Sequence, residues 1–169
     1  RHEDLRSGAS PWLSGPPRPA SIGLHSDTRC DVAIIGGGIT GALAAEHLTG
    51  LGHDVILVDR EREGFGSTAA STAMLQWEID LPLRRLAELY GFEKAADVYR
   101  RSFKAVEGLI ESVATLGLGA AFHPRDTVYL AAGDIGPREL LEECALRARA
   151  GLPGQLLDHT TLLSHYGFD

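Results

Sequence analysis

A six-residue turn, Gly36-Gly37-Gly38-Ile39-Thr40-Gly41, constrains the fold of this chain more than any other feature, because it satisfies the pattern G-x-G-x-x-G. The pattern alone is weak, but it gains weight where it follows a strand and opens a helix. An apolar run at residues 32–35 precedes it, helix-favouring residues 39–48 follow, and a second apolar run occupies residues 55–58. This order predicts an α/β fold with a Rossmann-like βαβ unit, a right-handed crossover and a first strand, residues 32–35, that is buried on both faces.

Each position of the turn has a physical role in binding a dinucleotide. Gly36 permits the sharp exit from the strand, Gly38 lets a pyrophosphate approach the backbone, and Gly41 lets the helix pack close to the sheet. The amides near Gly38, Ile39 and Thr40 have no helical partner, and the helix dipole adds partial positive charge at that end. The turn therefore predicts a site for the ADP half of a dinucleotide.

An acidic residue stands where the second strand of such a unit ends. Asp59 follows the apolar run 55–58, at the spacing expected for a residue that accepts hydrogen bonds from the adenosine ribose. A carboxylate there disfavours the 2′-phosphate of NADP. Arg60 weakens that argument, since its side chain could lie over the adenine edge or reach solvent.

The segment after the second strand bears on the choice between FAD and NAD. Residues 66–75 offer small side chains, hydroxyl groups and backbone amides. Such a loop can wrap a second part of a long ligand at close range, whereas a nicotinamide-binding unit would usually continue to its next helix and strand. This segment favours FAD.

Three segments together resemble the family of FAD-dependent D-amino acid oxidases and glycine oxidases, which includes sarcosine oxidases. They are residues 31–41, residues 55–60 and residues 66–75. The arm with Pro11-Trp12-Leu13 and the segment 157–163 also resemble bacterial members, so the likeness covers nearly the whole chain.

The resemblance implies a set of cofactor contacts. The residues that would contact the pyrophosphate are Gly36, Gly38, Ile39, Thr40 and Gly41. The residues that would flank the adenosine are Asp59 and Arg60. Ser67 and Thr68 match the pair near the pyrophosphate and ribityl chain, and Thr72, Ala73 and Met74 match the stretch beside the flavin ring. Some relatives bind the flavin covalently through a histidine, but Ala70 stands at that position here, so non-covalent FAD is expected.

The resemblance also implies an activity. Family members oxidise an amine or amino acid, with hydride transfer to flavin N5 and an imine product, so a small-molecule substrate of that class is expected. Substrate-binding residues usually come from the second half of these proteins, and no catalytic residue is assigned here. The chain looks truncated, and the missing C-terminal half or a partner chain is expected to complete the site; the fragment alone should be inactive.

Three segments are expected along the chain: an irregular arm at residues 1–30, the FAD-binding unit at 31–80, and an incomplete helical and short-strand segment of a second domain at 81–169. Trp12 could anchor the arm or be exposed. The helices expected in the last segment cover residues 83–90, 93–116, 137–150 and 160–166. A hairpin of residues 120–123 and 127–131, and a last strand at 155–157, are also expected.

Composition excludes several classes. The formal net charge of −7 argues against a nucleic-acid binder. No apolar run is long enough to span a membrane, and no metal-binding spacing is present. Cys30 and Cys144 are expected to be reduced thiols of a cytoplasmic protein. Two other hypotheses stay open: an NAD-binding dehydrogenase fragment, and a non-catalytic remnant that retains nucleotide binding.

Overall fold

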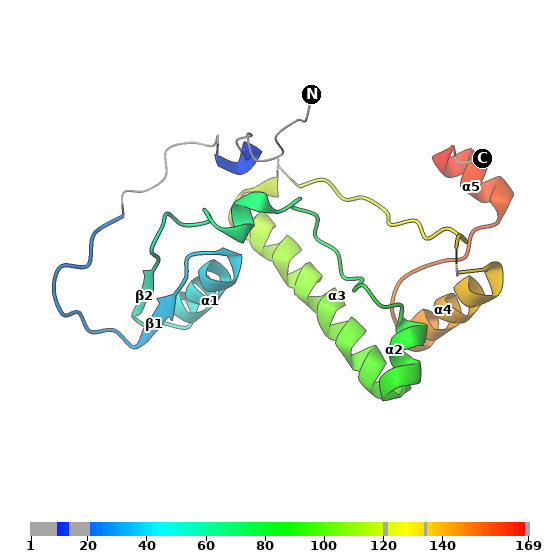
Figure 1. The fold of residues 1–169 in the computed structure, drawn as a ribbon, viewed down its shortest axis with the longest axis horizontal. Coiled ribbons are helices and arrows are strands. Elements are labelled where there is room, and N and C mark those ends of the chain that lie inside the picture. Colours follow the sequence, from blue (N-terminus) through cyan, green and yellow to red (C-terminus); the bar gives the residue numbers. More distant parts are fainter. Residues whose placement is uncertain (1–9, 14–20, 120–121, 134, 168–169) are drawn as a thin grey trace, which may run out of the picture. The chain divides into compact units, whose positions relative to one another are not determined.

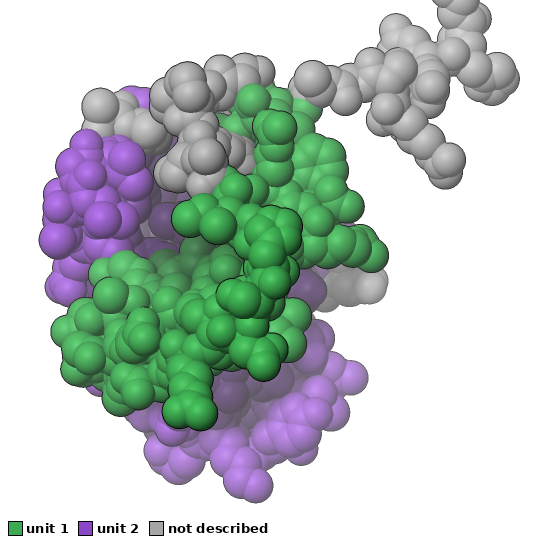
Figure 2. Space-filling model, turned by 90° about the vertical axis from the view of Figure 1, so that its left-hand side faces the viewer, with its two compact units in different colours: residues 1–74 green, residues 75–169 purple. Residues whose placement is uncertain are grey.

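The computed structural model describes residues 10–13, 21–119, 122–133 and 135–167. By contact density the chain divides into two compact units, residues 1–74 and residues 75–169, coloured separately in Figure 2. Each unit is described by itself. The first contains the Gly-rich turn, and the second is mainly helical (Figure 1).

The first unit has a parallel two-stranded sheet and one helix, as predicted. Strand β1 (Val32–Ile35) pairs in parallel with β2 (Val55–Val58), with Val32 opposite Val55 and Ile35 opposite Val58. Helix α1 (Ile39–Gly50) connects them and contacts both (Figure 1). The mixed helix and parallel sheet fit part of an α/β FAD-binding domain.

The burial predicted for β1 is wrong in the described structure. The side chains of β1 alternate between half-buried and exposed, and Ile35 is 89% exposed. Strand β2 is half-buried along its whole length. Burial on both faces requires a layer of helices on each side of the sheet, and among the described elements only α1 contacts it appreciably.

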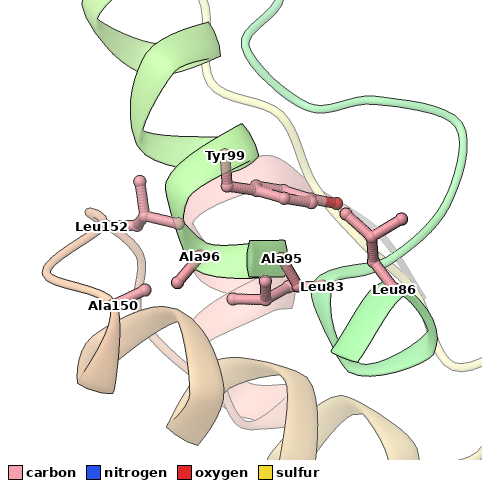
Figure 3. Close-up of a cluster of buried hydrophobic side chains, with 7 residues drawn as sticks. All are labelled: Leu83, Leu86, Ala95, Ala96, Tyr99, Ala150 and Leu152. Atoms are coloured by element: carbon pink, nitrogen blue, oxygen red, sulfur yellow. The ribbon is translucent and has the colours of Figure 1, made fainter. Parts of the chain in front are cut away.

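In the second unit, helices α2 (Leu83–Tyr90), α3 (Phe92–Thr115) and α4 (Pro137–Arg149) lie within a residue or so of the predicted bounds. Their core consists of residues that are at least nine-tenths buried: Leu83, Leu86, Ala95, Ala96, Tyr99, Ala150 and Leu152 (Figure 3). From the apolar face of α3, Tyr99 belongs to this core and Phe103 packs against it. Farther along the same face Ile110 is 39% exposed, so the fully buried part of α3 lies in its first turns.

A buried carboxylate of α4, that of Glu143, joins this helix to the beginning of α2. The carboxylate of Glu143 accepts hydrogen bonds from the amides of Leu83 at 2.9 Å and Arg84 at 2.7 Å. It also accepts from Nε of Arg147 at 2.7 Å, and Arg147 lies 3.6 Å from Glu78. Since Pro82 offers no side-chain cap, Glu143 satisfies amides of the first turn of α2 that would otherwise lack partners.

The two strands of the predicted hairpin and the last predicted strand are not formed in the described residues. Residues 122–131 and 155–157 have no strand structure, and a single antiparallel bridge joins Ala132 to Ile135. Residues 120 and 121 of the predicted hairpin lie outside the described part of the chain. An isolated two-stranded hairpin is marginal in water without a third strand or a covering helix, which explains this error.

The last helix and the arm complete the structure. Helix α5 (His159–Tyr166) is confirmed, with Asp158 capping its start by accepting a hydrogen bond from the amide of Thr161. In the arm, a 3-10 turn η1 (Pro11–Leu13) carries Trp12. Both cysteines are free thiols.

Candidate functional site: the Gly-rich turn and the loop after β2

The Gly-rich turn leaves β1 with the conformation that its first glycine was expected to supply. Gly36 has φ +109°, a region that favours glycine, and its amide extends the ladder by donating to the carbonyl of Val58 at 2.8 Å. At the other end of the turn, a Cβ on Gly41 would lie 1.9 Å from the carbonyl oxygen of Gly36. Helix α1 can therefore approach the end of β1 this closely only with glycine at position 41.

Gly37 is buried at the centre of the turn and is bonded through both of its backbone groups. Its amide donates to Oδ2 of Asp59 at 2.6 Å, and its carbonyl accepts from the amide of Gly64 at 2.8 Å. Oδ1 of Asp59 accepts from the amide of Glu61 at 2.7 Å. The turn is thus tied to the end of β2 and to the loop that follows it.

These amide contacts also set the charge of Asp59. The hydrogen bonds from the amides of Glu61 and Gly37 hold the pKa of the Asp59 carboxyl below its ordinary value, with Arg60 adding a smaller effect in the same direction. Asp59 is ionised at neutral pH and presents a carboxylate to solvent.

The start of α1 has one side-chain partner. Oγ1 of Thr68 accepts a hydrogen bond from the amide of Ile39 at 3.0 Å. Within the described part of the chain, the amides of Gly38, Thr40 and Gly41 donate no hydrogen bond. These amides are free to meet an anion.

The loop after β2 opens with a 3-10 turn, η2 (Ser67–Ala70), in which Ala69 is buried. Ala73 has φ +58°, an uncommon conformation for a residue with a side chain, and its amide donates to Oγ of Ser71 at 3.0 Å. Ser67, Thr72 and Met74 are exposed and have no bond to the turn. Arg60 points to solvent with its side chain 91% exposed, 3.7 Å from Glu61.

The structure therefore brings together the glycines of the turn, Asp59 and Thr68, and leaves Arg60, Ser67, Thr72 and Met74 apart from the turn. Sequence reasoning missed the roles of Gly37 and Gly64, which bond the turn to the loop. Gly37 stands at the first x of the G-x-G-x-x-G pattern, where any residue is allowed, so the pattern gives no reason to single it out. Both possibilities for Trp12 hold in part, since its indole Nε1 donates to the carbonyl of Ser71 at 2.8 Å while the residue stays 48% exposed.

The residues present fit the ADP half of a dinucleotide. A Cβ on Gly38 would meet only Oγ1 of Thr68, at 3.4 Å, so the space in front of this backbone is open to a ligand. Amides without hydrogen-bond partners lie at the same helix start, and a carboxylate stands at the end of the neighbouring strand. This is the donor and acceptor set that a pyrophosphate and a ribose require.

Comparison with known proteins decides the family. The family model for FAD-dependent oxidoreductases, DAO, matches residues 31–167. This chain belongs to that family. The resemblance drawn from the sequence motifs is confirmed, and FAD, rather than NAD, is the cofactor of the family.

Two curated relatives of this FAD-dependent oxidoreductase chain are similar to it over part of their length. A Bacillus subtilis (strain 168) protein named as a Rieske 2Fe-2S iron-sulfur protein, YhfW, is 33% identical over 57% of this chain and 19% of its own. The gamma-glutamylputrescine oxidoreductase of Escherichia coli (strain K12) is 27% identical over 60% of this chain and 24% of its own. The chain thus aligns with a quarter or less of either relative. No solved structure is significantly similar to it.

Two kinds of feature are absent from the described residues. None of the described helices combines the length and the apolar character needed to cross a membrane. In the same part of the chain, no three His, Cys, Asp or Glu side chains gather in a way that could hold a metal ion.

Proposed function

We propose that this chain forms the ADP-binding part of a flavoprotein that oxidises an amine or an amino acid, with FAD held non-covalently. The observation that supports this most directly is the group of unpartnered amides at the start of α1, where the backbone of Gly38 is also uncrowded. The proposal goes beyond the family assignment in naming the contacts and the substrate class.

The pyrophosphate would lie against the start of α1. The amides of Gly38, Thr40 and Gly41 are available as donors, and the helix dipole adds partial positive charge at the same point. The hydroxyl of Thr68 accepts from the amide of Ile39, which leaves its own proton to donate to a phosphate oxygen. Ser67, next to it in η2, would supply a second hydroxyl toward the ribityl chain.

The ribose of adenosine would lie against Asp59. A carboxylate has about four lone-pair positions, and the amides of Gly37 and Glu61 occupy two of them. The remaining positions can accept from ribose hydroxyls. Arg60, already in solvent, would flank the adenine.

The loop residues Thr72, Ala73 and Met74 would lie beside the flavin ring. The left-handed backbone of Ala73 bends the chain there, and the exposed side chain of Met74 is available for an apolar contact. No histidine stands in this loop, and Ala70 occupies the position where some relatives carry their covalent link.

Bound FAD supplies the acceptor for hydride from the carbon that bears the amine. The substrate class rests on the resemblance and on the relative named for gamma-glutamylputrescine, which is an amine. The residues of this chain would hold and orient the cofactor.

The test is to release the cofactor from the complete protein by denaturation and to identify it by mass spectrometry. FAD released without covalent peptide is the expected result. NAD without flavin, or a flavin that stays on a peptide, would contradict the proposal. Flavin reduction by a panel of amines and amino acids under anaerobic conditions then tests the substrate class, and a flavoprotein that none of them reduces would remove that part of the proposal.

A further inference from the structure

We infer that two residues of the N-terminal arm, Ser10 and Trp12, brace the loop of residues 67–74 and thereby position FAD. We call these two residues the arm brace. The inference rests on the proposed function, since it assumes that this loop contacts the cofactor. It adds to the site two residues that lie outside the matched family region.

The arm brace makes a paired contact with the backbone of the loop. Oγ of Ser10 donates to the carbonyl of Ala69 at 2.5 Å, and Nε1 of Trp12 donates to the carbonyl of Ser71 at 2.8 Å. Two donors spaced by two residues therefore meet two acceptors with the same spacing. Such matching fixes the register of the arm on the loop better than either bond could alone.

The arm itself is ordered at this point. The amide of Leu13 donates to the carbonyl of Ser10 at 3.0 Å, and the amide of Trp12 donates to Oγ of Ser10 at 3.3 Å. These bonds close the 3-10 turn η1 and hold the hydroxyl of Ser10 and the indole of Trp12 on one short segment. The two donors therefore act as a unit.

The braced loop is bonded to the pyrophosphate site on its other side. Thr68, which directly precedes Ala69, accepts from the amide of Ile39 at the start of α1. Ala69 and Gly37 are the buried residues of the described part of the first unit. The loop is thus held between η1 and α1, and release of one side would let the hydroxyl of Thr68 move away from α1.

The loop needs such support because its own sequence gives it little. Residues 66–73 are small, so they bury little apolar surface. Ala73 adopts an unfavourable backbone conformation, and the hydroxyl of Ser71 holds it there. Since Trp12 bonds to the carbonyl of Ser71, it restrains the residue that shapes the loop where the flavin would lie.

The test uses Trp12→Phe, which keeps an aromatic ring and removes the indole donor, and Ser10→Ala, with Ser10→Thr as the variant that retains a hydroxyl. Ile22→Ala is the matched control, because Ile22 belongs to the same arm and is 94% exposed. All are made in the complete protein. Two quantities are measured: amide hydrogen exchange of residues 67–74 in the apoprotein, and the Kd for FAD from quenching of flavin fluorescence.

Trp12→Phe and Ser10→Ala should speed exchange at Ala69, Ser71 and Ala73, and raise the Kd for FAD by about two- to tenfold. Ser10→Thr and Ile22→Ala should leave both quantities unchanged, and exchange in the second unit should not change in any variant. Normal FAD binding in Trp12→Phe and Ser10→Ala would overturn the inference while leaving the proposed function intact. Failure of the unmodified protein to bind FAD would overturn the proposed function itself, and the inference with it.

Discussion

The amide of Gly37 donates a hydrogen bond to Oδ2 of Asp59 across 2.6 Å. This bond joins the turn after β1 to the residue that ends β2, so the two parts proposed to hold pyrophosphate and ribose are fixed relative to each other before any ligand arrives. Preorganisation of this kind reduces the ordering cost of binding. The predictions below test the bond and the glycines around it.

Gly38→Ala should weaken FAD binding by about tenfold or more, because its methyl group would occupy the space proposed for the pyrophosphate. It should leave the apoprotein folded, since the new Cβ meets only Oγ1 of Thr68, at 3.4 Å. The measurement is FAD titration beside thermal unfolding of the apoprotein. Retained affinity would refute the assigned phosphate contact.

Gly41→Ala should act on the fold itself. The added Cβ would lie 1.9 Å from the carbonyl oxygen of Gly36, and relief of such a contact typically costs about 1–3 kcal/mol. Urea unfolding of the apoprotein measures this loss. Gly108→Ala is the control, because a Cβ there meets nothing within 4 Å in helix α3; it should stabilise slightly.

Asp59→Asn should lower FAD affinity and reduce the acid sensitivity of the first unit. The folded-state pKa of Asp59 lies below its ordinary value of 3.8. Its contribution to stability is therefore present above that ordinary value and is lost as the pH falls through the lower, folded-state value. The free energy of unfolding is measured for the unmodified protein and for Asp59→Asn from neutral pH into this acid range. It should fall less in Asp59→Asn than in the unmodified protein. An equal decline in both would mean that the amide bonds do not stabilise the carboxylate.

Glu143→Ala should destabilise the second unit by about 3–5 kcal/mol, because it leaves Arg147 buried without its main partner. It also removes the acceptor for the amides of Leu83 and Arg84. Glu143→Leu combined with Arg147→Met should be less destabilised than Glu143→Ala alone. A double-mutant cycle measured by chemical unfolding gives the coupling, and additive effects would contradict a direct pair.

Tyr99 provides an alkaline test of the same core. Burial raises the pKa of Tyr99 to about 12, against an ordinary value of 10.0, and its hydroxyl donates to the carbonyl of Leu81 at 2.7 Å. The neutral phenol is favoured in the folded state, so its contribution is present below pH 10.0 and is lost as the pH rises toward about 12. Tyr99→Phe should cost about 1 kcal/mol at neutral pH and show a smaller loss of stability above pH 10.0. If stability falls equally with rising pH in the unmodified protein and in Tyr99→Phe, burial of the neutral phenol does not stabilise the folded state.

The sequence was sufficient to predict β1, α1, β2 and helices α2 to α5, because each has a local cause. Gly36 ends β1, Pro137 begins α4, and the apolar spacing on α3 identifies its buried face. The prediction of a hairpin at residues 120–131 was wrong in the described residues. A short apolar run and a turn sequence do not show whether another strand is present to pair with it. The prediction that Ile35 is buried was wrong for a related reason. Burial of this side chain depends on which elements cover the sheet.

The candidate site was predictable to a similar depth. The glycines and Asp59 follow a known spacing within a strand, helix and strand, and this combination of residue types and spacing predicted a dinucleotide site. Other contacts join residues that are far apart in the chain. Gly37 is bonded to Asp59 and Gly64, and Ser10 and Trp12 are bonded to the loop. Nothing in a local pattern identifies such partners, because main-chain acceptors exist at every residue.

The placement of Glu143 has a consequence for synthesis on the ribosome. The first turn of α2 depends on a carboxylate that lies 60 residues farther along the chain from Leu83. At about 5–20 residues per second, translation delivers that carboxylate roughly 3–12 seconds after Leu83 has been added. During this interval the first-turn amides of the nascent α2 lack the acceptor that Glu143 supplies, and the side chains of Leu83 and Leu86 lack part of their core. Helices α2 and α3 can therefore complete their packing only after α4 has been synthesised.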